Sequence, residues 1–256
     1  MRSTQHARRR IAAAMTLGLA AVCSHATSTP PNAAAAMQAQ VPSETLSARQ
    51  QAIIPIAAWG AAGDMGRLAS ALNQGLDAGL TVNDAKEVLI QLYAYAGFPR
   101  SLNAMGELMK VLDARKQRGV QDAPGQAPTR AIPTGDALLA AGTSNQTRLI
   151  GGPARGAIYE FAPAMDQYLK AHLFGAIFER DNLDWQSREL ATVGMLSALQ
   201  GADSQLQAHM GFSMNVGLTA GQLGQLAQVL ADQVDAQAAQ RARAALARQL
   251  ASQPRR

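Results

Sequence analysis

Few side chains in this sequence are of a type that could transfer a proton near neutral pH. The sequence holds four histidines, and only His172 and His209 remain once a predicted leader, residues 1–26, is removed. His209 lies in the middle of a predicted helix and shares a face with Leu206 and Ser213, so its ring is expected to point toward the packed side. There it can act as a general acid or base, or it can be a buried histidine that bonds a backbone carbonyl.

Three charged residues are candidates for positioning that histidine or a substrate. Arg188 and Glu189 are neighbours in the sequence, so they face different sides of their helix and are not expected to pair with each other. A member that points inward needs a partner, because an unpaired buried charge is costly; otherwise the two form a charged first turn. Glu87 lies in a largely apolar predicted helix, where a carboxylate can relay a proton or orient another group.

An aromatic hydroxyl and a helix break occur together at the end of the same helix. Tyr95 precedes Gly97-Phe98-Pro99, and the residue before a proline resists helical geometry. A break inside a helical bundle can form the mouth of a pocket. The alternative is an ordinary corner between two helices.

These candidates are distributed over two copies of one helical unit. Gly79-Leu80-Thr81 recurs as Gly217-Leu218-Thr219, and the difference between 81 and 219 sets an offset of 138 residues. At this offset other residues coincide without a gap: Gly63 with Gly201, Leu68 with Leu206, Leu92 with Leu230 and Leu108 with Leu246. The repeated phrase predicts a helix stop, a buried leucine and a threonine N-cap. Because the copies have kept different polar residues, we expect one composite site.

The composition predicts an all-α fold. Aromatic residues make up 4% of a chain that is 48% hydrophobic, which is typical of helices packed through small and flexible side chains. The formal net charge of +5 comes largely from four arginines at the N-terminus: Arg2, Arg8, Arg9 and Arg10. Because no basic surface interleaved with aromatic residues follows, we expect no nucleic acid among the partners.

Residues 1–26 have the organisation of an export signal. A basic start precedes an apolar stretch at 11–22, and Ala26 ends a fitting cleavage site. The general and the twin-arginine routes both fit, and Cys23 leaves lipidation open. The apolar stretch is too short for a permanent membrane helix. We therefore expect a periplasmic or secreted protein that is not held in a membrane after cleavage.

After that cleavage the chain contains no cysteine. Thiolate nucleophiles, disulfides and cysteine-ligated metals are thereby excluded from the mature chain, and two histidines do not predict a metal site. We expect neither a metal nor an organic cofactor.

Periodicity and punctuation divide the rest of the chain into four parts. They are a disordered lead-in at 27–44, a first repeat at 45–118, a linker at 119–156 and a second repeat at 157–250. The linker is rich in proline, glycine, threonine and asparagine, so we expect it to lie on the surface. In the first repeat, Pro55 predicts a kink or a later start of the first helix.

The sequence resembles the carboxymuconolactone decarboxylase family, which is related to alkylhydroperoxidase D. The matching pieces are Arg188-Glu189-Leu190-Ala191-Thr192, Gly201, His209, Asn215-Val216-Gly217-Leu218-Thr219, Glu87, Tyr95-Ala96-Gly97-Phe98-Pro99 and Asn103-Ala104. Together they cover most of 47–115 and 185–235. The resemblance implies a fold of short packed helices and a homo-oligomer, and a trimer of this tandem chain would reproduce a hexamer-like ring.

The decarboxylases of this family remove CO2 from a lactone acid. The catalytic residues implied by the resemblance are His209, which would deliver or accept the proton, with Glu189 and Glu87. The implied substrate-binding residues are Arg188, Tyr95, Gly97, Phe98, Pro99 and Asn103.

The chain departs from the peroxidase branch of the family and from its own internal symmetry. That branch has a Cys-x-x-Cys pair where this chain reads Gly201-Ala202-Asp203-Ser204, so thiol peroxidase chemistry is excluded. In the first repeat, Ala71 lies opposite His209 and Gln51 lies opposite Glu189. Each copy is therefore half decayed: it lacks some of the family's residues that the other copy has kept.

Two functions remain in view at this point. The first is cofactor-free decarboxylation or isomerisation of a small lactone or oxo acid, with His209 as the acid or base. The second is a non-catalytic protein that keeps the fold and binds a small organic acid or assists assembly, including as a structural partner of another exported enzyme.

Overall fold

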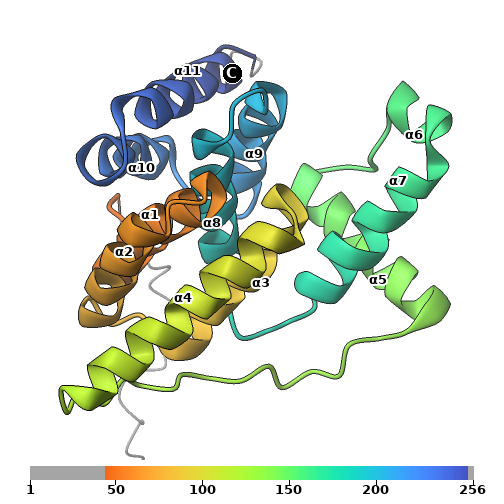
Figure 1. Ribbon diagram of the computed structural model, residues 1–256. Helices are drawn as coiled ribbons and strands as arrows, with labels where there is room; N and C mark the ends of the chain where they lie inside the picture. Colours follow the sequence, from red (N-terminus) through yellow and green to blue (C-terminus); the bar gives the residue numbers. More distant parts are fainter. Residues whose placement is uncertain (1–43, 253–256) are drawn as a thin grey trace, which may run out of the picture. The chain divides into compact units, whose positions relative to one another are not determined.

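The computed structural model describes residues 44–252, and these residues form helices and loops with no strand among them (Figure 1). The all-α fold predicted from composition is confirmed. The predicted signal peptide, Cys23 and the lead-in up to residue 43 lie outside the described residues.

Each half of the described chain contributes four helices in the same order. The first half has α1 (Ala48–Ala62), α2 (Met65–Asp77), α3 (Val82–Ala96) and α4 (Phe98–Gln117). The second half has α8 (Trp185–Ala198), α9 (Asp203–Asn215), α10 (Ala220–Gln233) and α11 (Ala236–Ser252). Shifting α2 by the offset between residues 81 and 219 reproduces the bounds of α9, and α3 and α4 then begin at the residues where α10 and α11 begin. The tandem helical repeat is confirmed.

The repeated Gly-Leu-Thr phrase ends one helix and begins the next in both halves. Gly79 and Gly217 have φ angles of 92° and 98°, a left-handed conformation that glycine adopts without steric cost. The following leucines, Leu80 and Leu218, are 2% and 3% exposed. Thr81 and Thr219 each form a reciprocal capping box with the residue three positions on, which satisfies two backbone N–H groups per helix.

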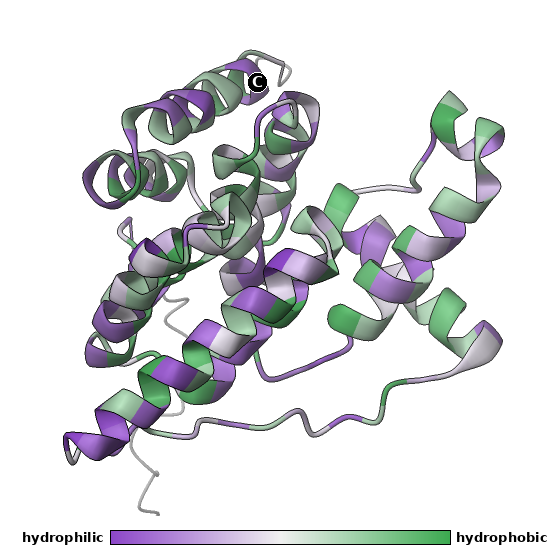
Figure 2. Cartoon of the chain, in the orientation of Figure 1, coloured by the Kyte–Doolittle hydropathy of each residue, from purple (hydrophilic) through white to green (hydrophobic). Residues whose placement is uncertain are grey.

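The two halves share one hydrophobic core. The central pair is α1 and its counterpart α8, which pack against each other, while α3 contacts α8 and α10 contacts α1 in a reciprocal arrangement. Both central helices are buried on almost all sides, as Ile53, Ile54, Leu190 and Val193 illustrate. Gly194 permits the close approach, because a Cβ there would lie 2.9 Å from the backbone oxygen of Ile54. Figure 2 shows hydrophobic and hydrophilic residues alternating along the helices.

The first helix differs slightly from the prediction. It begins at Ala48, directly after the N-cap Ser47, and continues through the buried Pro55 to Ala62, so the proline does not delay its start. A short turn at Gly63 and Asp64 separates α1 from α2. Gly60 lies inside α1. Glycine suits this position because a Cβ there would lie 3.0 Å from a methyl carbon of Leu92.

Part of the predicted linker is helical. Residues 119–134 are extended and lie against the start of α3, where Val82 and Asn83 donate to backbone oxygens of this strap, but Gly135–Ile150 form α5. The glycine and threonine content of α5 obscured it, although Gly142 has a packing role: it allows α5 to touch the backbone of the segment at Lys170.

The partner of α5 is the segment that follows it. This segment consists of α6 (Ala157–Phe161), α7 (Pro163–Tyr168) and the π-helix η2 (Leu169–Ile177), and η2 packs along α5. These elements have no counterpart in the first half, so the helices related by the offset begin at Trp185 and not at residue 157. In Figure 1 they form the green group beside α3 and α4.

Within residues 44–252, no helix combines the length and apolar character that crossing a membrane requires.

Candidate active site

A buried imidazole and a buried carboxylate meet between α8 and α9. His209 Nδ1 lies 2.8 Å from Glu189 Oε2, and the two residues are 7% and 0% exposed. With Glu189 ionised, Nδ1 carries the hydrogen and donates it to the carboxylate, which leaves Nε2 as the basic nitrogen. No described residue forms a hydrogen bond with Nε2. The predicted approach of Glu189 to His209 is therefore present in the structure.

Two aromatic rings hold the imidazole from its sides. The ring of Tyr95, from α3, meets the His209 ring edge-on with centroids 5.7 Å apart, and the ring of Phe212 does the same at 4.9 Å. Tyr95 belongs to the first half of the chain, whereas His209 and Glu189 belong to the second. The site is thus composite, as the different polar residues of the two copies predicted.

Polar atoms with unused bonding capacity surround the same imidazole. Tyr95 Oη and Glu189 Oε1 are buried and have no hydrogen-bond partner of normal geometry among the described residues. Burial raises the pKa of the Tyr95 hydroxyl far above its ordinary value, and the charge of Glu189 raises it further. The nearby Thr192 hydroxyl opposes this shift without forming a well-directed bond to Tyr95. Tyr95 therefore stays protonated and can donate a hydrogen bond.

The second predicted catalytic carboxylate, Glu87, binds two arginines and not His209. Glu87, on α3, is 1% exposed and accepts a forked pair of bonds from Arg180, with Nη2 at 2.6 Å and Nε at 2.9 Å. Arg188 Nη2 donates to the other side of the same carboxylate at 3.1 Å. No hydrogen bond joins Glu87 to His209 among the described residues. The prediction that Glu87 acts directly with His209 is not supported by this geometry.

Arg188 is a structural cation in this arrangement. It is 0% exposed, and it also donates to the Arg180 backbone oxygen at 2.8 Å and to Gln91 Oε1 at 3.3 Å. Burial lowers its pKa, and the charge of Glu87 opposes that shift. Because its guanidinium is enclosed and already paired, a direct role in binding substrate, as predicted for Arg188, does not fit.

Burial raises the pKa of Glu87, but the hydrogen bonds from Arg180 and the charge of Arg188 outweigh it, so the pKa lies below its ordinary value. Glu87 is consequently ionised near neutral pH and neutralises part of the charge of the two arginines. Since Glu87 lies in the first half and both arginines follow it in the chain by more than ninety positions, this ion network joins segments that are far apart in the sequence.

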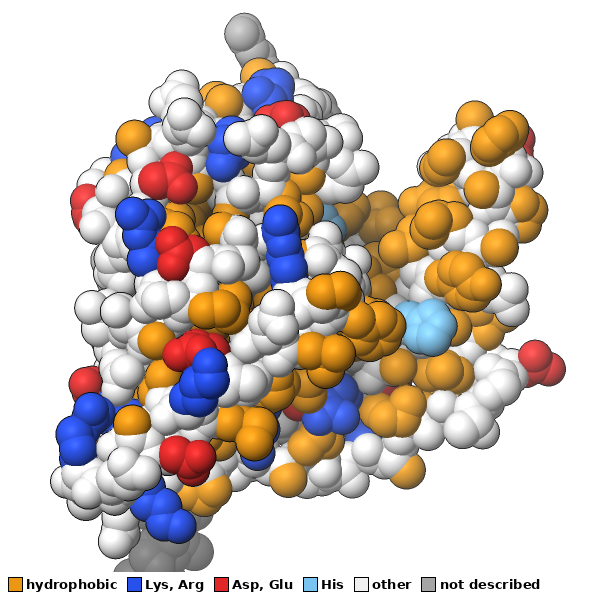
Figure 3. Space-filling view, viewed as in Figure 1, with side chains coloured by type: hydrophobic (Ala, Val, Ile, Leu, Met, Phe, Trp, Pro, Cys, Tyr) orange, Lys and Arg blue, Asp and Glu red, His pale blue; other side chains and the backbone are white. Residues whose placement is uncertain are grey.

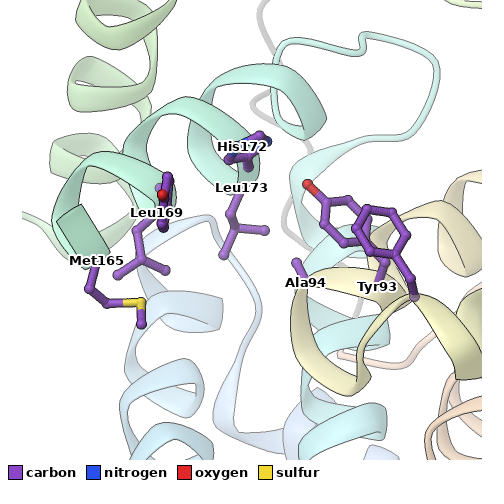
Figure 4. Close-up of a pocket in the computed structure, with 8 residues that line it drawn as sticks. Tyr93, Ala94, Met165, Leu169, His172 and Leu173 are labelled. Atoms are coloured by element: carbon purple, nitrogen blue, oxygen red, sulfur yellow. The ribbon is translucent and has the colours of Figure 1, made fainter.

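An open hollow of about 360 Å³ lies between the α3–α4 corner and the α7–η2 segment (Figures 3 and 4). Its lining is mostly apolar and contains no lysine or arginine: Tyr93, Ala94, Phe98, Met165, Tyr168, Leu169, His172 and Leu173. His209 does not line it. Leu173 belongs to a small hydrophobic cluster against which Tyr95 and Phe212 also pack, so this cluster connects the hollow to the rings around His209.

The helix break serves as a corner and also borders the hollow. Gly97, with a φ of 84°, ends α3, and Pro99 follows in the first turn of α4. Phe98 is 63% exposed, stacks on Tyr93 with ring centroids 4.5 Å apart, and lines the hollow. The break therefore forms a corner between α3 and α4 and also lies at the edge of a hollow. Asn103 is exposed on α4 and does not line the hollow.

Some residues of the site have no prominent sequence signal. Arg180 lies in a polar turn, and nothing in its surroundings indicates that it holds Glu87. Phe212 could have been found, because it follows His209 by three positions and so shares its helix face. Within residues 44–252, no cluster of three histidine, cysteine, aspartate or glutamate side chains could hold a metal ion.

Comparison with known proteins agrees with this geometry. The carboxymuconolactone decarboxylase family matches two segments, residues 30–109 and 163–248, which correspond to the two halves of the fold. No curated protein matched the chain. Because the matched segments cover well over half of the sequence and fall on repeated helices that carry the buried histidine and glutamate, the chain belongs to the carboxymuconolactone decarboxylase family.

Proposed function

We propose that this protein is a cofactor-free proton-transfer enzyme that decarboxylates or isomerises a small lactone or oxo acid. The observation that carries the proposal is the buried pair of His209 and Glu189, in which Nδ1 is held at 2.8 Å and Nε2 has no partner among the described residues. A carboxylate that fixes one ring nitrogen orients the other for proton transfer and faces the positive charge that the ring acquires.

The proposed steps balance without an added reactant. In decarboxylation, the bond between the substrate carbon and its carboxylate breaks, CO2 leaves, and the electron pair moves into a conjugated carbonyl as an enolate. His209 Nε2, which has first taken up the proton of the substrate's carboxyl group, then delivers this proton to carbon and is again unprotonated. In isomerisation, Nε2 removes a proton from one carbon and returns it to another. In both reactions the Tyr95 hydroxyl is positioned to donate to the oxygen on which negative charge develops.

The hollow supports this choice of substrate class. Its apolar lining suits the ring of a lactone, and Tyr93 and Ala94 in that lining directly precede Tyr95. Arg180 and Arg188 are both bonded to Glu87, and no lysine or arginine lines the hollow, so no unpaired cation there faces a second carboxylate. We therefore expect a substrate with at most one negative charge. We also propose that the protein acts in the periplasm or outside the cell, as residues 1–26 predict.

Glu189→Gln tests the orienting role of the carboxylate. We expect kcat to fall by about 10-fold to 100-fold, because a neutral amide can hold the ring in either orientation and does not stabilise its positive charge. The amide is nearly the same size, so the midpoint of thermal unfolding should change little. The turnover of lactones and oxo acids that stabilise the protein in a thermal-shift screen provides the measurement. Wild-type turnover in the variant would contradict the assignment.

We further propose that the chain forms a homo-oligomer, with a trimer as the expected state. Along α4, Phe98, Leu102 and Met109 share one face and are 63%, 66% and 63% exposed, and Phe161 at the end of α6 is 88% exposed. Figure 3 shows hydrophobic side chains gathered on both sides of the hollow. Apolar faces of this kind are characteristic of interfaces.

Light scattering coupled to size exclusion tests this assembly. The wild-type protein should elute as an oligomer, and Leu102→Glu combined with Met109→Glu should yield monomers, because two charges would have to be buried in the interface. Lys110→Glu on the same helix, where the lysine is exposed, is the control and should leave the assembly intact. A monomeric wild-type protein would exclude the proposal.

A further inference from the structure

The internal repeat relates the residues around His209 to four other residues, and these four line a second hollow. The residues that correspond to Glu189, His209 and Phe212 in the first half are Gln51, Ala71 and Gln74, and the residue that corresponds to Tyr95 in the second half is Gln233. All four counterparts line one hollow of about 220 Å³, between α1, α2 and the end of α10. The fold therefore keeps these four positions together in both halves, while their chemistry differs.

The change in chemistry has a consistent direction. Each group that can ionise is replaced by a neutral one: glutamate by glutamine, tyrosine by glutamine and histidine by alanine. The replacement of His209 by Ala71 also removes a ring, and Ala52, Gly75 and Ala78 keep the rest of the lining small. Such a site has no general acid or base, so it cannot perform the proton transfer proposed for its counterpart.

The three amides keep bonding capacity for a ligand. Gln51 donates from Nε2 to the Leu46 backbone oxygen at 2.8 Å, and its Oε1 accepts no bond from the described residues. The side chains of Gln74 and Gln233 form no hydrogen bond with any described residue. An amide both donates and accepts, so three of them around one hollow suit a molecule with a carbonyl or an amide group.

A neighbouring hollow adjoins this one and has a charged lining. It measures about 360 Å³, shares Pro55, Ala71, Gln74 and Gln233 with the first, and adds Trp59, Arg67, Ser70 and Asp232. The Arg67 guanidinium lies over the Trp59 ring, 4.6 Å from its centroid. Trp59 is 7% exposed and donates from Nε1 to the Gln233 backbone oxygen at 3.2 Å. The uncharged lining thus belongs to the smaller hollow alone, and Trp59 is linked to it through Gln233.

We propose that the smaller hollow, lined by Gln51, Gln74 and Gln233, is a second, non-catalytic binding site for a small uncharged carbonyl compound, such as a lactam or lactone. It does not depend on the proposed catalytic function, since none of its residues belongs to the site around His209. A carboxylate is disfavoured there because none of the residues that line the smaller hollow carries a cation that would replace its hydration.

The two tryptophans of the chain provide the readout. In a nitrogen–proton NMR spectrum they give two indole signals, and Trp185→Phe identifies that of Trp59. In Arg67→Gln, which lacks the cation over the Trp59 ring, titration with 2-pyrrolidone, a neutral lactam, should shift the Trp59 signal in a saturable manner, whereas succinate at the same concentration should not. His209→Gln should leave this response unchanged, which separates the second site from the catalytic one.

Matched variants decide whether the amides bind the probe. Gln74→Leu combined with Gln233→Leu, both at exposed positions, should weaken 2-pyrrolidone binding by about 10-fold, the effect of losing two hydrogen bonds. Gln228→Leu, at an exposed position of α10 outside both hollows, should not weaken it. The absence of a saturable Trp59 shift, an equal response to succinate, or unaltered binding by the double variant would each overturn the proposal.

Discussion

His209→Gln is expected to lower kcat for the lactone or oxo acid substrate by about 10²-fold to 10⁴-fold, the usual contribution of a positioned acid or base. Glutamine fills similar space and can still bond Glu189, but it neither accepts nor delivers a proton at neutral pH. Gln205→Ala, at an exposed position on the same helix, serves as the control and should retain wild-type turnover.

Ligand binding separates the catalytic function from the binding-only alternative. The ligand-induced rise in unfolding temperature should persist in His209→Gln, because the variant leaves unchanged the apolar hollow in which we propose that the ligand binds. Turnover by the wild type and its loss in the variant, with binding retained, agrees with an enzyme. Binding by both proteins without turnover of any stabilising lactone or oxo acid would favour the non-catalytic alternative.

Glu87→Ala is expected to lower the free energy of unfolding by about 3–5 kcal/mol. The substitution leaves Arg188 enclosed without its anionic partner, and removing one member of a buried pair is far more costly than removing both. Glu107→Ala on α4 is the control, since Glu107 pairs with the exposed Lys110 and should contribute less than about 1 kcal/mol. Denaturant unfolding of the three proteins measures both effects.

The effect of Glu87 also has a defined pH dependence. Its pKa is lower in the folded state than the ordinary value of 4.5, so its stabilising contribution is present above that value and is lost as the pH falls through the folded pKa. The difference in stability between the wild type and Glu87→Ala should therefore be largest near neutral pH and should shrink below pH 4.5. A difference that grows on acidification would contradict the assigned ion network.

The helices were predictable because their boundaries depend on local chemistry. Gly79 and Thr81, with their counterparts at 217 and 219, specify where helices end and begin, and the capping groups lie within three residues of the boundary. The helix in the predicted linker was missed for the opposite reason. Gly142 resembles a loop residue in the sequence, and its function becomes apparent only where α5 touches the backbone at Lys170.

The site was predictable in its members but not in all of their contacts. That Arg188 and Glu189 point to different partners follows from helix geometry, and each has found one in the structure, Glu87 and His209. The sequence offers no rule for choosing among acidic partners across separate helices, so Glu87 was assigned to the wrong group. Arg180, from a loop 93 positions away from Glu87, binds this carboxylate.

The most direct test of the proposed His209–Glu189 pair is to determine which ring nitrogen of His209 carries the hydrogen. In protein labelled with nitrogen-15 histidine, the signals of His209 can be assigned by their loss in His209→Gln, and their chemical shifts report which ring nitrogen carries the proton. We predict that the proton lies on Nδ1, which faces Glu189, and that this preference is reduced in Glu189→Gln. A ring protonated at Nε2 and insensitive to Glu189→Gln would contradict it.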